Sequence, residues 1–246
     1  MTRKILALWA MPRSTSTAFA TMMGARRDFL VLDEPFGLYF HYSEERKSDR
    51  YPEAEINPAY NFQPLFQDLV DKSQKEPVFI KDMARYISDR ADEAFLSHFD
   101  HTFIIRHPAK ALPSLFARWP DFRLSEAGYA ELHQLFEATT AFLGKVPPLI
   151  DSDDLVKKPA ATVKAYCDAV GITFMPQALK WEPKVQKVRW EEWEGGWHSE
   201  AQSSQEFKER ERKDYVKIEE SDRLQEAYDF CLPYYQKLYE HRLRIE

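Results

Sequence analysis

The sequence predicts an α/β fold, a three-layer sandwich in which helices cover both faces of a central, mostly parallel β-sheet. Five short apolar runs of strand length recur within the first 150 residues, and such runs are typical of parallel strands that are buried on both faces. Helical segments separate these runs, which is the alternation that βαβ units produce. The 246 residues are 44% hydrophobic and 14% aromatic and include no distinct linker, so we expect a single domain over residues 1–246.

The predicted elements follow one another in a regular order. Strands are expected at Ile5–Trp9, Phe29–Leu32, Val78–Ile80, Thr102–Ile105 and Pro148–Ile150. Helices are expected at Ser16–Ala25, Pro64–Ser73, Ala91–Phe99, Pro108–Arg118, Ser125–Leu143 and Pro159–Val170. Residues Tyr39–Phe62, rich in proline and aromatic residues, are expected to form a long ordered loop, a type of segment that is often functional. After Gly171, a tryptophan-rich segment is expected to form a cap and the charged stretch from Gln205 to form closing helices.

Charge and composition exclude several classes of protein. The net charge of −6 and the pI near 5.7 disfavour a broad binding surface for nucleic acid or for an anionic membrane. They are compatible with a local basic pocket. No run of 18 apolar residues occurs, and Ile5–Met11 is too short for a signal peptide or a membrane span. Cys167 and Cys231 have no CxxC partner and the seven histidines form no HxH or HxxxH pair, so we expect a cytoplasmic protein without disulfides or metal.

A run of hydroxyl side chains with one arginine directly follows the first predicted strand. The segment consists of Pro12, Arg13, Ser14, Thr15, Ser16 and Thr17. Unpaired N–H groups at a helix N-terminus, together with hydroxyl and guanidinium donors, bind anionic oxygens. Serine and threonine are also ordinary N-cap residues, so simple capping is the alternative. The GxxxxGK[ST] pattern is absent because no glycine precedes Met23, which disfavours an ordinary ATP- or GTP-hydrolysing protein.

This segment resembles the 5'-phosphosulfate loop of sulfotransferases, in which proline, a basic residue and hydroxyl residues follow the first strand. A second similarity is Arg106 at a strand end with Ser114 eight positions later, the arrangement that binds the 3'-phosphate in that family. A third and partial similarity is the segment Asp151–Pro159, whose following helix ends at Gly171. We expect this third segment to be structural, with Asp154 capping or bracing the fold and Gly171 ending the helix.

The resemblance implies the sulfotransferase type of P-loop fold and an enzyme of the EC 2.8.2 type. Such an enzyme moves a sulfuryl group from 3'-phosphoadenosine-5'-phosphosulfate (PAPS) to a hydroxyl or amine of a small-molecule acceptor, releases PAP and needs no metal. In the family a late loop closes over the donor, and Trp197 could stack or His198 donate a hydrogen bond there, with an aromatic core cluster as the alternative. The donor-binding residues that the resemblance implies are Arg13, Ser14, Thr15, Ser16, Thr17, Arg106, Ser114, Trp197 and His198.

Candidate catalytic residues lie where the predicted strands end. Arg13 is expected to stabilise the charge that develops on the departing oxygens. Glu34 directly follows the second strand, at the carboxyl edge where open α/β sheets place their ligands. Its resemblance to the glutamate of one branch of the family makes Glu34 the expected base, whereas a loop cap or salt bridge is the alternative. Lys81 follows the third strand and is expected to steady the sulfuryl oxygens.

Weaker candidates and rival functions complete the expectations. Asp82 is the reserve base, and His41, His107 and His198 are weak alternatives to it. A P-loop small-molecule or nucleoside kinase is one rival function, and a non-catalytic protein that binds PAPS or PAP is another. The acceptor stays undetermined, although aromatic residues within 39–62 suggest an apolar pocket. Whether the chain forms a homodimer also stays open.

Overall fold

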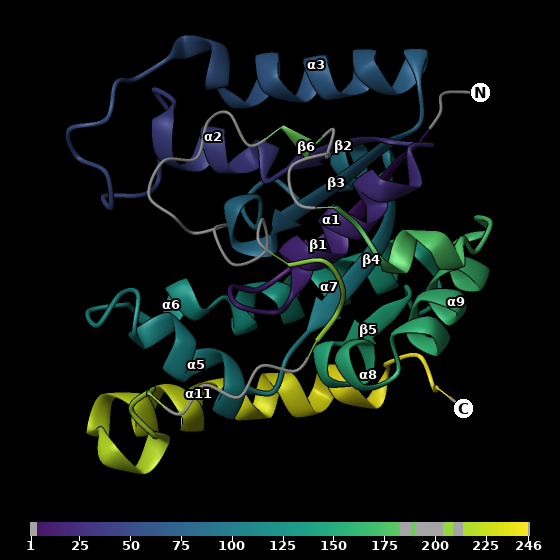
Figure 1. Ribbon diagram of the computed structural model, residues 1–246. Helices are drawn as coiled ribbons and strands as arrows, with labels where there is room; N and C mark the ends of the chain where they lie inside the picture. Colours follow the sequence, from purple (N-terminus) through teal and green to yellow (C-terminus); the bar gives the residue numbers. More distant parts are fainter. Residues whose placement is uncertain (1–3, 183–187, 190–203, 209–213, 246) are drawn as a thin grey trace.

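A parallel six-stranded sheet forms the centre of the computed structural model, which describes residues 4–182, 188–189, 204–208 and 214–245 (Figure 1). The strand order is β5-β4-β1-β3-β2-β6, and every pairing is parallel. The strands are β1 (Ile5–Ala10), β2 (Leu30–Asp33), β3 (Val78–Met83), β4 (Phe99–Ile105), β5 (Leu149–Asp151) and β6 (Val188–Arg189). The predicted α/β fold with a mostly parallel sheet is confirmed.

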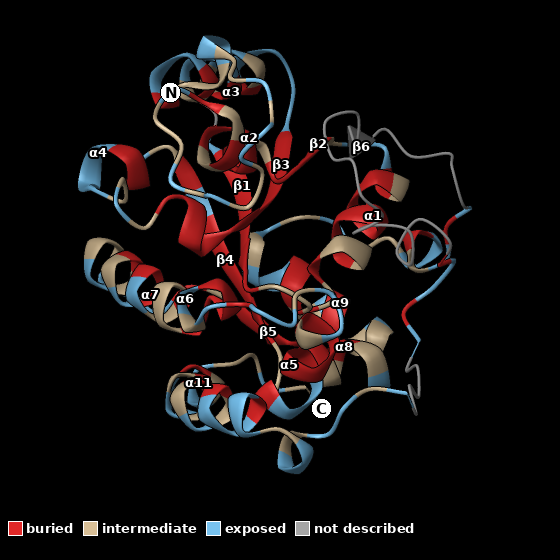
Figure 2. Cartoon of the chain, turned by 90° about the vertical axis from the view of Figure 1, so that its left-hand side faces the viewer, coloured by how far each residue is buried: buried red, intermediate tan, exposed pale blue. Residues whose placement is uncertain are grey.

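The central strand β1 shows why these apolar runs become strands. All six of its residues are buried, and it pairs with β3 on one side and β4 on the other. Side chains alternate between the two faces of a strand, so a run that is apolar at every position requires helices on both faces. Figure 2 shows the buried strands between α7 (Tyr129–Leu143) on one face and α1 (Ser16–Arg26) and α9 (Pro159–Val170) on the other.

The remaining helices close the ends of this sandwich. They are α2 (Pro35–Tyr42), α3 (Phe62–Lys75), α4 (Glu93–Leu96), α5 (Pro108–Phe116), α6 (Leu124–Ala127), α8 (Ser152–Lys157) and α11 (Asp222–Glu240). Short 3₁₀ turns are η1 (Pro58–Tyr60), η2 (Ala84–Tyr86), η3 (Pro176–Leu179) and η4 (Ile218–Glu220). The closing helix α11 packs against α5 and α7, and none of the described helices is long and apolar enough to cross a membrane.

Several predicted boundaries differ from the observed ones. Residues Tyr39–Tyr42 belong to α2 instead of the expected loop, because Pro35 occupies the first helical turn and the apolar segment that follows packs against β3. The helix expected at Ala91–Phe99 is reduced to α4, since Phe99 already begins β4. The helix expected at Ser125–Leu143 is divided into α6 and α7 by Gly128, whose φ of 75° is left-handed.

The expected aromatic cap is only partly within the described residues. Trp181 is buried, and its ring lies 5.1 Å from that of Phe207 in an edge-on contact. Trp190, Trp193, Trp197 and His198 lie outside the described residues. The donor-binding role expected for Trp197 and His198 therefore stays a prediction.

Candidate active site

A cavity of about 620 Å³ opens where the strands end, at the carboxyl edge of the sheet. Residues that directly follow β1, β2, β4 and β5 line it, as expected for a ligand site of an open parallel sheet. The size is that of ordinary small-molecule pockets. The lining includes Arg13, Ser14, Thr15, Ser16, Thr17, Glu34, Arg106, Ser114, Ser152 and Tyr215.

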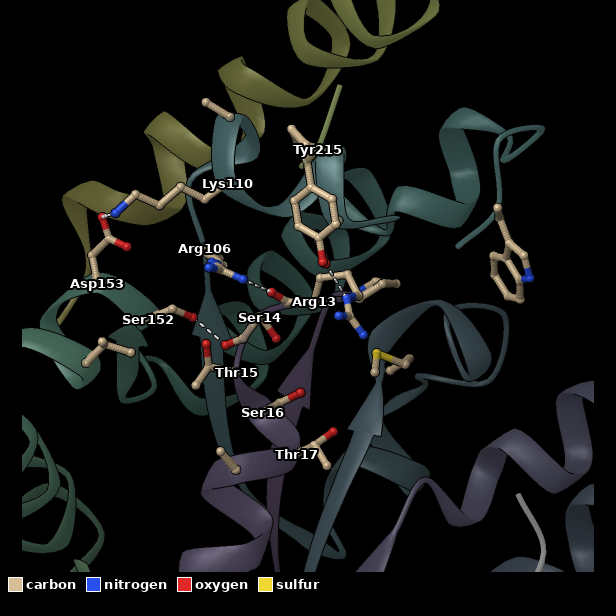
Figure 3. Close-up of a pocket in the computed structure, with 18 of the residues that line it drawn as sticks. Arg13, Ser14, Thr15, Ser16, Thr17, Arg106, Lys110, Ser152, Asp153 and Tyr215 are labelled. Carbon is tan, nitrogen blue, oxygen red and sulfur yellow. Dashed lines mark hydrogen bonds and ion pairs between the residues drawn. The ribbon is translucent and has the colours of Figure 1, made fainter. Parts of the chain in front are cut away.

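The loop after β1 has an unusual backbone. Arg13 and Thr15 adopt left-handed conformations with φ of 64° and 67°, which cost about 1–3 kcal/mol each for residues other than glycine and are often found at functional sites. Two side chains hold the loop in place. Arg106 Nη1 donates to the backbone oxygen of Arg13 at 2.8 Å, and Ser152 Oγ donates to the backbone oxygen of Ser14 (Figure 3).

This loop leads directly into the N-terminus of α1, which begins at Ser16 beside the cavity. Ser14 is 1% exposed, and its Oγ is buried without a hydrogen-bond partner among the described residues. A buried hydroxyl without a partner is costly, so it calls for a ligand atom that can bind it. An anionic oxygen at the helix N-terminus would satisfy both this hydroxyl and the partial positive charge there.

The two arginines expected at the donor site come together. Arg13 Nε donates to Ser114 Oγ at 2.8 Å, and this oxygen lies 3.2 Å from the hydroxyl of Tyr215. Figure 3 shows Arg13, Arg106 and Tyr215 converging above the loop. Burial lowers the pKa of Arg106 from its usual value; the charge of Asp153 opposes this shift, and the charge of Arg13 adds to it. Two neighbouring guanidinium groups in one cavity form a site for a strongly anionic ligand.

Glu34 lines the same cavity and belongs to a buried charge cluster. It is 6% exposed, lines the cavity and has a left-handed φ of 49°. Lys81 Nζ lies 2.5 Å from Glu34 Oε1 and 2.8 Å from Asp33 Oδ1. Tyr86 donates its hydroxyl to Glu34 Oε2 at 3.3 Å. The carboxylate of Glu34 is therefore fixed through both of its oxygens. Glu34 both lines the cavity and forms a salt bridge, the two arrangements that the sequence left as alternatives.

Lys81 has a different place from the one expected. It is fully buried in β3 and lies outside the cavity lining, behind Glu34 and Asp33. Burial alone would lower the pKa of Lys81, but the adjacent carboxylates outweigh burial and raise that pKa above its usual value. The geometry therefore places Lys81 against Glu34 and Asp33, and its expected contact with the sulfuryl oxygens stays a prediction.

The weaker candidates are mostly structural. Asp82 is fully buried outside the cavity lining and accepts the N–H groups of Phe36 and Met83 at 2.7 and 2.8 Å. These contacts favour a structural role, and the reserve-base hypothesis stays a prediction. His107 caps α5 by accepting the N–H of Ala109. His41 does line the cavity, but burial and then the charge of Arg85 lower its pKa to about 3.

Several cavity residues were not predicted. Lys110, which forms an ion pair of 2.7 Å with Asp153, and Tyr215 lie at the arginine side. Arg85, Tyr86, Met83 and Trp119 lie among the lining residues as well, whereas of the aromatic residues expected there only Tyr51 lines the cavity. Lys110 and Ser152 stand next to recognisable motifs, but Tyr215 lies in a charged stretch with no motif of its own.

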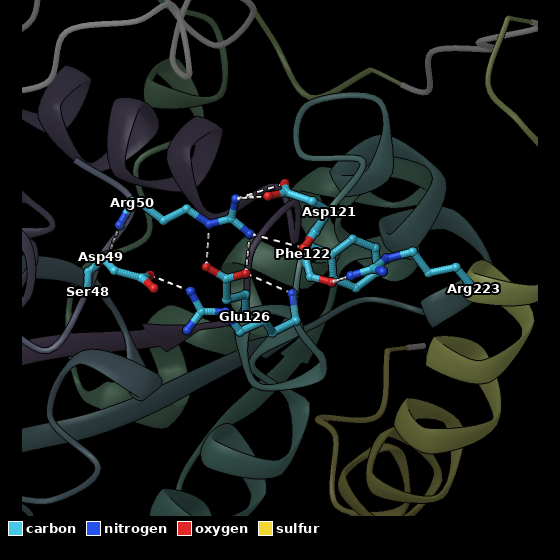
Figure 4. A network of polar contacts seen from close by, with 8 residues as sticks. Ser48, Asp49, Arg50, Asp121, Phe122, Glu126 and Arg223 are labelled. Atoms are coloured by element: carbon cyan, nitrogen blue, oxygen red, sulfur yellow. Dashed lines mark hydrogen bonds and ion pairs between the residues drawn. The ribbon is translucent and has the colours of Figure 1, made fainter. Parts of the chain in front are cut away.

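A polar network holds the segment that carries Tyr51 (Figure 4). Arg50 donates to Glu126 Oε1 at 2.7 Å and to both carboxylate oxygens of Asp121 at 2.8 Å. Its guanidinium carbon lies 4.7 Å from the centre of the Trp119 ring. Arg50 therefore connects two cavity-lining aromatic residues, Tyr51 and Trp119, that are distant in the sequence.

No group of three or more histidine, cysteine, aspartate or glutamate side chains that could hold a metal ion occurs among the described residues. Most polar side chains that line the cavity are cationic or carry hydroxyls, and the carboxylates in the lining are those of Glu34, Asp153, Glu206 and Glu219. This chemistry fits an anionic ligand.

Comparison with known proteins identifies relatives of the chain. A family model described as a sulfotransferase domain matches residues 3–240. Two Arabidopsis thaliana proteins, named branched-chain-amino-acid aminotransferase-like proteins 2 and 1, are each 28% identical over 195 residues, which is 77% of this chain and 34% of theirs. The chain thus spans about a third of the length of these curated relatives.

Two solved structures are also similar. The sulfotransferase domain from the curacin biosynthetic pathway has a TM-score of 0.48 and 16% identity, covering 99% of this chain and 93% of that one. The sulfotransferase domain from the Synechococcus PCC 7002 olefin synthase has a TM-score of 0.41 and 16% identity, covering 72% of this chain and 76% of that one.

Proposed function

The chain belongs to the sulfotransferase domain family, and we propose that it transfers a sulfuryl group from PAPS to a hydroxyl or amine of a small-molecule acceptor. One observation carries the proposal. A single cavity is lined by two arginines, a helix N-terminus, the fixed carboxylate of Glu34 and Ser14, whose buried hydroxyl has no hydrogen-bond partner among the described residues.

The arginine side fits the donor. Residues Arg13–Thr17 offer hydroxyl, guanidinium and helix N-terminal donors for the 5'-phosphosulfate. Arg106 and Ser114 lie within the same lining, beside Arg13, and are assigned to the 3'-phosphate. Tyr215, whose hydroxyl lies 3.2 Å from Ser114 Oγ, is added to this set. The cationic groups need no metal to neutralise the phosphates.

The proposed reaction is an in-line displacement at sulfur. The acceptor oxygen or nitrogen forms a bond to sulfur while the bond between sulfur and the donor's phosphate oxygen breaks, and PAP leaves. The acceptor's proton passes to Glu34. Arg13 stabilises the negative charge that develops on the departing phosphate oxygen, which is the kind of fixed electrostatic contribution that dominates such transfers.

Lys81 is assigned as a positioning residue in this mechanism. Its ammonium group contacts Glu34 Oε1 at 2.5 Å and is fully buried. Together with Tyr86 it holds the carboxylate in one orientation, and fixed orientation is a large part of the advantage of a catalytic group.

The buried free thiols of Cys167 and Cys231 support a reducing compartment such as the cytoplasm.

The direct test uses radiolabelled sulfate in PAPS and an acceptor panel of phenols, alcohols and amines, with magnesium removed by a chelator. We expect transfer to at least one class of acceptor and stabilisation of the protein by PAP in a thermal-shift measurement. Stabilisation by ATP with magnesium but not by PAP would instead indicate a small-molecule kinase. PAP binding without transfer to any acceptor would indicate a non-catalytic binding protein.

A further inference from the structure

Arg85 is a cavity-lining cation that the donor site does not use. It lies in η2, directly after β3, on an element different from those that carry Arg13 and Arg106. The residue is 8% exposed. Its guanidinium carbon lies 5.0 Å from the centre of the Phe40 ring and 5.2 Å from that of Tyr86. These aromatic contacts hold the side chain in a partly dry environment.

The charge of Arg85 has no contact partner of opposite sign in the described part of the chain. Its Nε is buried without a hydrogen-bond partner, and no described carboxylate forms an ion pair with it. Other arginines nearby are paired, since Arg50 contacts Glu126 and Arg90 contacts Glu45 at 2.8 Å. A buried charge without a partner is strongly unfavourable. Because Arg85 also lines a cavity, a bound ligand can supply the missing partner.

Of three carboxylates near Arg85, two are bonded elsewhere. The third, Glu131, has a buried Oε2 without a hydrogen-bond partner among the described residues but forms no ion pair with Arg85. Glu126 accepts hydrogen bonds from Arg50 on both of its oxygens. Glu34 is held by Lys81 and Tyr86. Burial raises the pKa of Glu131, although the charge of Arg85 opposes this increase. None of these carboxylates forms an ion pair with Arg85. Its guanidinium group lies beside the Tyr86 hydroxyl, which carries no opposite charge, so a ligand in the cavity can supply that charge.

We propose that Arg85 selects the acceptor by binding a carboxylate, so that the substrate is a small molecule carrying a carboxylate close to the hydroxyl or amine that is sulfated. The inference rests on the proposed function. A guanidinium group presents parallel N–H donors that match a carboxylate. Tyr86, the residue after Arg85, contacts the proposed base Glu34. Tyr86 therefore lies between the proposed carboxylate-binding residue and the proposed base, which favours a compact hydroxy or amino acid.

The test compares carboxylic acids with their neutral esters. The pairs are 4-hydroxybenzoate with methyl 4-hydroxybenzoate and 3-hydroxybutyrate with its methyl ester, assayed with labelled PAPS. We expect the wild-type protein to prefer the acid of at least one pair by tenfold or more in kcat/KM. Arg85→Gln should raise KM for that acid and leave the ester unchanged, while Arg85→Lys should keep part of the preference.

Binding of the acids and esters to the wild-type protein is a second measurement, which requires neither turnover nor the Arg85→Gln variant. In the complex with PAP, the acids should raise the melting temperature of the wild-type protein more than the esters do. Arg244→Gln, a change at an exposed arginine after α11, is the matched control and should keep the preference. Equal responses to acids and esters, no response to either, or a preference that a folded Arg85→Gln protein retains would overturn the inference.

These outcomes are distinct from failure of the proposed function. Transfer to neutral phenols with no preference for acids leaves the sulfotransferase proposal intact and rejects the role of Arg85. Absence of both PAP binding and transfer to every acceptor rejects the proposed function, and the inference about Arg85 with it.

Discussion

Arg106 donates a hydrogen bond from Nη1 to the backbone oxygen of Arg13 at 2.8 Å. These residues are 93 positions apart, and each follows a strand of the sheet. The contact links the loop proposed to bind the 5'-phosphosulfate with the residue proposed to bind the 3'-phosphate. A change at Arg106 is therefore expected to affect both ends of the donor site, although not equally.

Arg106→Ala and Ser114→Ala should weaken binding of PAP more than binding of adenosine-5'-phosphosulfate, which has no 3'-phosphate. Loss of a charge-assisted hydrogen bond costs about 1.5–3 kcal/mol, and this cost applies only when the 3'-phosphate is present. The Arg106 variant should also lose some affinity for the second ligand through the displaced loop. Isothermal titration of both ligands checks the difference, and equal losses would contradict the assignment.

Arg13→Ala should reduce turnover more than donor binding. The proposed contacts of Arg13 strengthen as the bridging oxygen gains charge, and such contacts lower the barrier without tightening the ground state to the same extent. Arg13→Lys should recover only part of the rate, because an ammonium group cannot reproduce the parallel N–H donors of the planar guanidinium group. Rapid-quench measurement of the transfer step, beside PAP affinity, separates the two effects. An effect confined to affinity would argue against the catalytic role.

Arg50→Gln should weaken acceptor use while leaving PAP binding unchanged. The substitution removes the contacts to Glu126 and to the Trp119 ring. Tyr51 and Trp119, which both line the cavity, then lose the arginine that connects them. Displacement of positioning groups by about an ångström can cost up to a hundredfold in rate, and we expect an increase in acceptor KM of roughly tenfold. The control is Arg123→Gln, an exposed arginine in the same network that pairs with Asp49, which should have little effect on KM.

His101 should make the protein less stable at mildly acidic pH. Trp9 Nε1 donates to His101 Nδ1 at 2.9 Å, and His101 Nε2 lies 2.9 Å from the backbone oxygen of Leu96. Burial, opposed by the Leu96 contact and assisted by the charge of Lys4, lowers the pKa of His101 to about 4. The unfolded chain therefore takes up the proton first as pH falls below about 6.5, so folding stability declines from there towards pH 4 by about 3 kcal/mol.

Urea unfolding between pH 7.5 and 5 measures this decline. His101→Gln keeps an acceptor and a donor but does not titrate, so its free energy of unfolding should depend less on pH than that of the wild-type protein. His41, with a pKa of about 3, acts in the same direction in both proteins and cancels in the comparison. Identical pH profiles for the two proteins would show that His101 does not contribute.

The parts of the fold that the sequence predicts correctly are those that local patterns determine. The apolar run of β1 leads directly into the hydroxyl-rich loop, and Gly171 ends α9 with a left-handed φ of 72°. Local signals also mislead where tertiary contacts decide. The prolines and aromatic residues after Tyr39 suggest a loop, yet the first of these residues extend α2 because packing against β3 buries them.

The site is predictable in its positions but not in its contacts. Strand ends mark Arg13, Glu34 and Arg106, because every parallel strand ends at the same edge of the sheet. Which residue faces the cavity depends on register and on distant partners. Lys81 lies near the carboxyl end of β3, yet contact with Asp33 and Glu34 keeps it behind the cavity wall. Tyr215 reaches Ser114 from 101 positions away, a pairing with no sequence motif.

Glu34→Gln tests the proposed base most directly. Glutamine keeps the size of the side chain, its Oε1 can still accept from Lys81 and its amide NH2 can donate to the Tyr86 hydroxyl, but it cannot take up a proton at neutral pH. We expect PAP to bind with unchanged affinity and turnover to fall by about a hundredfold or more, the usual contribution of general base catalysis. Because Lys81 is fully buried, the variant also leaves part of its charge uncompensated, so folding must be checked by circular dichroism and by PAP binding.

A phenolic acceptor of low pKa distinguishes lost chemistry from lost structure in this variant. Such an acceptor is already largely ionised and needs little help from a base, so the Glu34→Gln protein should approach wild-type rates with 4-nitrophenol while remaining slow with an unsubstituted phenol. A structural defect would instead slow both acceptors alike. Lys81→Met is the companion variant: if Lys81 only orients Glu34, its loss should slow the phenol more than the nitrophenol, following the pattern of Glu34→Gln. Equal slowing of both acceptors in a folded Lys81→Met protein would favour the direct contact with the sulfuryl group that the sequence suggested for this lysine.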